Sequence, residues 1–90
     1  MSLNGQRVVV LGGTSGIGFA TAQAAARQGA AVTVVSSNPS NVQRALAMLP
    51  ENASGEVADL TDRVQVDTVF ERIGQFDHLI SDVPHFSMSI

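Results

Sequence analysis

Apolar residues in this chain form short continuous runs that alternate with longer segments of helical spacing. Runs rich in Val, Leu and Ile predict four strands, at 7–11, 31–35, 55–58 and 78–81. The intervening segments place apolar residues three and four positions apart, or are rich in Ala, and predict helices at 17–28, 39–49 and 62–73. The order β-α-β-α-β-α-β with short connections favours an α/β fold with a parallel sheet in the order 3-2-1-4 and helices on both faces.

Signals at the ends of these helices support the assignment. Asn38 followed by Pro39 is typical of a helix start, and Thr61 is the expected N-cap of the third helix. Gly29 and Gly74 stand where glycine ends a helix. The 90 residues fit one small domain, and we expect a half-domain over 1–81 followed by a tail or short extra strand over 82–90.

The turn after the first strand carries the most specific chemistry. Gly12 would let the chain turn sharply, Gly16 would let the backbone approach phosphates, and Gly18 would let the helix pack against the sheet. Thr14 and Ser15 are expected to contact phosphate, since no base is placed to activate either as a nucleophile. The N–H groups and positive dipole end of the helix favour an anion, so the pattern predicts a dinucleotide pyrophosphate site.

Ser36 and Ser37 lie at the end of the second strand. Residues at this position of a dinucleotide-binding fold discriminate between NAD and NADP. An acidic residue there would bond the ribose 2′-hydroxyl of NAD. Two hydroxyls and no acid favour NADP, with NAD the less favoured cofactor. Arg44 is interpreted as a solvated helix residue.

Composition excludes several classes of function. The net charge is -3 and the pI is near 5.0, which argues against nucleic acid or an anionic membrane as partner. The chain has no cysteine, and no apolar run approaches the roughly 18 residues of a membrane span, so we expect a cytoplasmic protein. The spacing of Asp77, His78, Asp82 and His85 fits no standard metal site.

These residues resemble the N-terminal half of a short-chain dehydrogenase/reductase, over residues 3 to about 81. The resemblance is carried by four segments, Gly12-x-x-x-Gly16-Ile17-Gly18, Gly29-Ala30, Asp59-Leu60 and Phe76-Asp77-His78-Leu79-Ile80. It implies a Rossmann-like fold, truncated after the fourth strand, in which the glycine turn with Ile17 holds the pyrophosphate of the cofactor. It also implies hydride transfer to or from a carbonyl or alcohol.

The resemblance assigns the remaining cofactor contacts. Asp59 and Leu60 would lie beside the adenine. Where the family has Asn-Asn-Ala-Gly after the fourth strand, this chain reads Ser81-Asp82-Val83-Pro84, and we expect Ser81 to contact the cofactor. Leu11 replaces the Thr that usually precedes the first glycine.

The family's catalytic Ser and Tyr-x-x-x-Lys lie beyond the matched region, and this chain contains no tyrosine and no lysine. The sequence therefore predicts a cofactor-binding half that is catalytically incomplete. The alternative is a non-catalytic nucleotide-binding or self-associating interaction module. A third possibility is a product altered after Ile80. In each case the fourth strand would have an open edge, for which we expect self-association or a completing chain.

Overall fold

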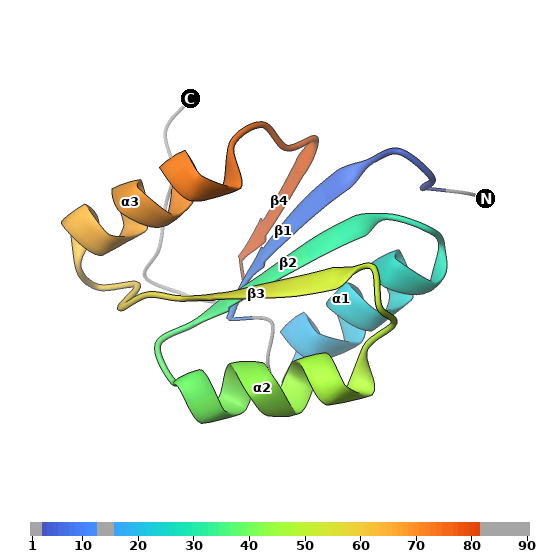
Figure 1. Ribbon diagram of the computed structural model, residues 1–90, viewed down its shortest axis with the longest axis horizontal. Coiled ribbons are helices and arrows are strands. Elements are labelled where there is room, and N and C mark those ends of the chain that lie inside the picture. The colour runs from blue at the N-terminus through green and yellow to red at the C-terminus, as the bar shows by residue number, and fades with distance from the viewer. Residues whose placement is uncertain (1–2, 13–15, 82–90) are drawn as a thin grey trace.

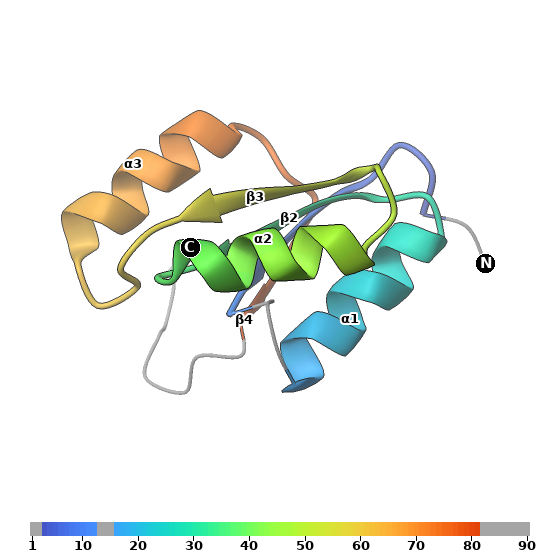
Figure 2. The ribbon, with the colours of Figure 1, turned by 60° about the horizontal axis from the view of Figure 1, so that its bottom comes forward.

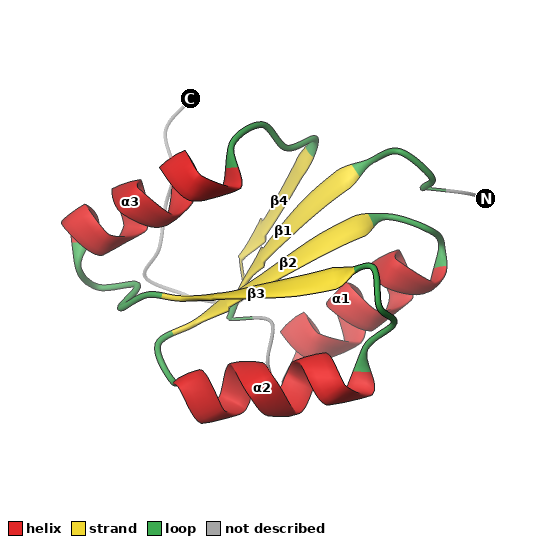
Figure 3. Ribbon diagram, in the orientation of Figure 1, coloured by secondary structure: helices red, strands yellow, loops and turns green. Residues whose placement is uncertain are grey.

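The computed structural model describes residues 3–12 and 16–81 and has the predicted α/β architecture. Within these residues the sheet has four strands. Figure 1 shows them fanned side by side, with α1 and α2 against one face and α3 against the other. Figure 3 shows the same layers coloured by type of element. The elements are β1 (Arg7–Leu11), α1 (Gly16–Arg27), β2 (Ala31–Ser36), α2 (Pro39–Met48), β3 (Ala53–Val57), α3 (Arg63–Ile73) and β4 (His78–Ser81).

All strand pairs in the described sheet are parallel, and their order is β3-β2-β1-β4. The predicted strand order is thereby confirmed. β1 is central, and its Val8, Val9, Val10 and Leu11 are between 0% and 3% exposed. The continuous apolar run follows from this position, because a strand covered on both faces needs apolar side chains on both.

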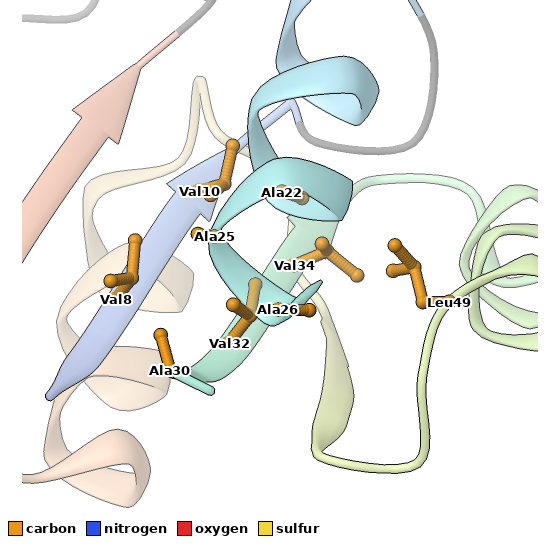
Figure 4. Packing of buried hydrophobic residues seen from close by; sticks show 9 residues of the cluster. All are labelled: Val8, Val10, Ala22, Ala25, Ala26, Ala30, Val32, Val34 and Leu49. Carbon is orange, nitrogen blue, oxygen red and sulfur yellow. The ribbon is translucent and has the colours of Figure 1, made fainter. Parts of the chain in front are cut away.

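Alternating residues of the sheet form two separate cores. The first packs Val10 and Val34 against the alanines of α1, including the fully buried Ala22, as Figure 4 shows. The second lies on the opposite face, where Leu11 and Val35 meet Val69 and Ile73 of α3. Because these alanines are small, α1 lies close to the sheet. This packing fixes the direction in which α1 leaves the glycine turn.

Two local predictions were wrong. The third strand begins at Ala53 and ends at Val57, earlier than predicted, because Ala53 and Ser54 pair with Val32 and Thr33 of β2. The N-cap of α3 is Asp62 rather than Thr61, since the Asp62 carboxylate accepts hydrogen bonds from two backbone N–H groups of the first turn. The predicted cap of α2 at Asn38, with Pro39 following, is confirmed. Residues 82–90, predicted as a tail or strand, lie outside the described residues.

Candidate dinucleotide site

The carboxyl ends of the strands bring most of the predicted site residues to one edge of the sheet. Leu11, which precedes Gly12, is in register with Val35 of β2 and with Ser81 of β4. Ser36 is in register with Val57, two residues before Asp59. Ligands of open α/β sheets bind at this edge, at the point where the strand order reverses. Here that point lies between β1 and β4.

The glycine turn departs sharply from the sheet. The Gly12 N–H donates to the carbonyl of Val35 at 2.8 Å, so the last contact with β2 is made at the turn itself. Gly12 has φ 76° and Gly16 has φ 61°, in the left-handed region that favours glycine. No atom lies within 4 Å of a Cβ placed on Gly16, so the space beside that backbone is open to a ligand. Thr14 and Ser15 lie outside the described residues.

Helix α1 begins directly at this turn. Its first turn contains no acidic residue, so no carboxylate of that turn neutralises its positive dipole end. Gly18 is buried, whereas the side chain of Ile17 is 77% exposed. The first turn therefore combines a buried glycine with backbone N–H groups that have no acceptor within the helix, the kind of group that can hold an anion.

The end of β2 presents two serines. The Ser36 Oγ accepts a hydrogen bond from the Asn38 N–H at 3.3 Å, and the Ser36 carbonyl accepts from Ala58 at 3.0 Å. A hydroxyl that accepts in this way can still donate its own proton. Ser37 is exposed, and Arg44 is exposed on α2. The end of β2, at Ser36 and Ser37, therefore contains hydroxyls and no carboxylate.

The segment after β3 holds a fixed carboxylate. Asp59 is exposed, and its Oδ1 accepts from the hydroxyl of Thr61 at 2.6 Å and from the Thr61 N–H at 2.9 Å. The hydroxyl bond, followed by the backbone bond, holds the pKa of Asp59 below its ordinary value. Leu60 is half-buried against the second core.

Sequence reasoning did not identify the supporting roles of Thr61 and Gln65. The Oε1 of Gln65 accepts from the Asp59 N–H at 2.8 Å, which ties the segment to α3. The signal was present, because Asp-x-Thr is a common pattern for a turn closed by a side chain. Among residues 3–12 and 16–81, no group of three or more metal-ligating side chains occurs. No helix in that part of the chain is long and apolar enough to cross a membrane.

The fold and the turn together define a Rossmann-like α/β protein. The model of the short chain dehydrogenase family matches residues 6–83. Among curated relatives, "Probable oxidoreductase" of Streptomyces lividans is 39% identical, covering 91% of this chain and 29% of that protein. The 3alpha-hydroxysteroid dehydrogenase of Mediterraneibacter gnavus is 35% identical, covering 91% of this chain and 36% of that protein.

The structural comparison gives the same result. A solved structure of a short chain dehydrogenase/reductase family protein aligns with a TM-score of 0.88 and 31% identity, covering 92% of this chain and 35% of that one. The chain belongs to the short-chain dehydrogenase/reductase family. It spans about a third of the length of the relatives it matches. Membership implies a nicotinamide dinucleotide cofactor, and the donors at the glycine turn suit its diphosphate.

Proposed function

We propose that this chain is the NADP(H)-binding portion of an oxidoreductase of this family. One observation carries the proposal, namely the left-handed glycine turn that joins β1 to the start of α1 at the carboxyl edge of the sheet. Gly12, Gly16, Ile17 and Gly18, with Thr14 and Ser15 from the same turn, hold the diphosphate. Their backbone N–H groups suit a diphosphate without any basic side chain.

Residues at the carboxyl ends of the other three strands contact the rest of the dinucleotide. Ser36 and Ser37 contact the adenosine ribose and its 2′-phosphate. Asp59 and Leu60 lie beside the adenine, and Ser81 lies on the path towards the nicotinamide. NADP is favoured over NAD because the end of β2 offers hydroxyl donors and no carboxylate to repel a phosphate.

The side chains that transfer the proton have to be supplied by residues outside these 90. The cofactor, when bound, supplies or accepts a hydride. The family's proton donor is a tyrosine assisted by a lysine, and this chain contains neither residue type. Reduction of a carbonyl therefore requires additional polypeptide that carries those groups.

The surface beside β4 is where that polypeptide would join. No strand pairs with the outer edge of β4 among the described residues. Next to it, between α1 and β4, lies a groove of about 570 Å³ lined in part by Leu3, Val8, Ala25 and Ile80. Because the relatives are about three times as long, the occupant we propose is a further parallel strand and its helix, of the kind the relatives' remaining length provides.

The absence of tyrosine and lysine also favours a second candidate function, which involves no catalysis. The chain would then bind nucleotide, or associate with a second copy through β4, without performing any reaction. Binding and association without turnover would be its complete activity. The two functions differ in whether a completing polypeptide restores carbonyl reduction.

Fluorescence titration with NADPH and NADH tests the proposal, using a matched pair of glycine variants. Gly16→Ala and Gly74→Ala both place alanine at positive φ, 61° and 76°, and neither new Cβ has a neighbour within 4 Å. Only Gly16 lies at the proposed site. NADPH binding that is lost in Gly16→Ala and kept in Gly74→Ala supports the proposal. Equal loss in both variants, or no binding by the wild-type chain, contradicts it.

Hydrogen exchange tests the joining surface separately. We expect the β4 amides that face the open edge to exchange quickly in the dilute chain and to become protected when the completing polypeptide is added. Protection that instead increases with the concentration of this chain alone would identify a second copy as the occupant.

A further inference from the structure

A tight turn at the N-terminus contains the dipeptide Asn4-Gly5. The Gln6 N–H donates to the Leu3 carbonyl at 3.0 Å, and Gly5 has φ 82°. Asn4 does not have positive φ, because among the described residues only glycines do. A four-residue turn with positive φ at its third position alone is a type II turn, and Asn4 occupies the second position.

This turn is fastened to the end of α1. The Leu3 N–H donates to the carbonyl of Gln28 at 2.8 Å, and Figure 2 shows the N-terminal segment beside the last turn of that helix. Gly29 ends the helix with φ 95°, and a Cβ placed there would overlap the Oδ1 of Asn4. The Asn4 side chain therefore lies directly against the helix terminus, in space that only glycine leaves open.

We propose that Asn4 is a site of spontaneous deamidation in this protein. The Gly5 backbone nitrogen attacks Cγ of Asn4, the bond from Cγ to the side-chain nitrogen breaks, and ammonia leaves with the proton lost from the Gly5 nitrogen. Water then opens the resulting succinimide at either carbonyl and yields aspartate or isoaspartate. The step needs no other reactant. Glycine is the least obstructive residue for this attack, since it has no Cβ.

The other three asparagines are protected by their neighbours. Asn38 precedes Pro39, which has no N–H to lose. Asn41 precedes the β-branched Val42. The Asn52 amide nitrogen donates to two carbonyls at 2.6 and 3.0 Å, which holds it in place.

The native turn controls the reaction. A type II turn sets ψ of its second residue near +120°, which directs the following nitrogen away from the Asn4 side chain. Cyclisation therefore requires the turn to open first. The product carries a new negative charge beside the carbonyl end of α1, where the helix dipole disfavours anions, and isoaspartate also lengthens the main chain. Deamidation thus weakens the attachment of the N-terminus to α1.

Peptide mapping by mass spectrometry tests this in the full chain, incubated at mildly alkaline pH with and without urea. Without urea we expect aspartate and isoaspartate at Asn4 only, and in urea, where the turn is open, we expect them to form at Asn4 at least about tenfold faster. Conversion of Asn52 at a rate matching Asn4 without urea, or equal rates for Asn4 in the two conditions, would overturn the proposal. Neither result depends on nucleotide binding, so the outcome is independent of the proposed function.

Two variants separate the effect of a negative charge at position 4 from the deamidation reaction itself. Asn4→Gln keeps the amide while lengthening the side chain, and should form no product at position 4. Asn4→Asp introduces the charge directly and should lower the thermal midpoint by about 2–6 °C relative to Asn4→Gln. An Asn4→Asp midpoint equal to that of Asn4→Gln would overturn the inferred effect on the attachment.

Discussion

The carboxylate of Asp59 is held by Thr61 through two hydrogen bonds to one oxygen, from the hydroxyl at 2.6 Å and from the backbone N–H at 2.9 Å. The Asp59 N–H is held in turn by the Gln65 side chain on α3. The group proposed to lie beside the adenine is thus positioned by the start of a helix. Its lowered pKa follows from the same bonds, because hydrogen-bond donors favour the ionised form.

Removing the Thr61 hydroxyl should raise the pKa of Asp59. Thr61→Val loses the 2.6 Å bond and keeps the shape of the side chain, whereas Thr61→Ser keeps both donors. NMR titration of the Asp59 carboxyl carbon should show an upward shift in Thr61→Val and little change in Thr61→Ser. Identical titration of the two variants would mean that the hydroxyl does not set the pKa.

The hydrogen bond from the Thr61 hydroxyl to Asp59 makes the free energy of unfolding depend on pH. The folded-state pKa of Asp59 lies below its unfolded value, so its contribution to stability is fully present above about pH 4 and is lost as pH falls through the folded-state pKa. Urea unfolding should therefore show Thr61→Val as less stable than Thr61→Ser at pH 6, with the difference shrinking below about pH 4. A difference that stays constant across this range would contradict the linkage.

A carboxylate at the end of β2 should reverse the proposed preference for NADP. Ser37 is exposed there, and Ser37→Asp would place a negative charge beside the proposed 2′-phosphate. Like-charge repulsion should weaken NADPH binding by at least about tenfold and leave NADH binding unchanged or stronger. Gln43→Glu, on the exposed face of α2, adds the same charge away from the end of the strand. Equal weakening of NADPH binding by both variants would show only a general charge effect.

Features that depend on neighbouring residues in the chain were predictable from the sequence. The apolar run of β1 and the Asn38 cap of α2 are of this kind, and the structure has both as predicted. Strand order followed from chain connectivity, because parallel strands joined by single helices leave few arrangements.

Features set by contacts across the fold were not predictable in the same way. Ala53 and Ser54 are not a β-rich pair, and they become strand because β2 lies beside them, with the Thr33 and Ser54 hydroxyls 3.1 Å apart. Thr61 and Asp62 were both possible caps of α3, and in the structure the Thr61 hydroxyl donates to Asp59 while the Asp62 carboxylate accepts from the first-turn N–H groups. The glycine turn was recognisable from spacing, because Gly12 and Gly16 adopt the positive φ that favours glycine.

Gly55 has a role that sequence did not reveal. A Cβ placed on it would overlap Cγ1 of Val42 and lie 3.1 Å from Cδ1 of Leu46, so α2 packs directly on the strand backbone. Gly55→Ala should cost about 1–3 kcal/mol in the free energy of unfolding, because the helix must move away. The double variant Gly55→Ala with Val42→Ala should recover part of that loss. Additive losses from the two changes would show that the two groups do not compete for the same space.

The last prediction concerns the opposite end of α1 from the glycine turn. The Asn52 side-chain nitrogen donates to the carbonyls of Ala26 at 3.0 Å and Ala30 at 2.6 Å, joining the segment before β3 to the helix terminus. Asn52→Ala should cost about 1–2 kcal/mol in urea unfolding, and Asn52→Asp more, because a carboxylate would face two carbonyl oxygens. NADPH affinity of the folded protein should stay unchanged in Asn52→Ala, since the proposed diphosphate site lies at the other terminus of α1. A variant with full stability would show that water replaces the amide, and one with lost affinity would show that the two ends of α1 are coupled.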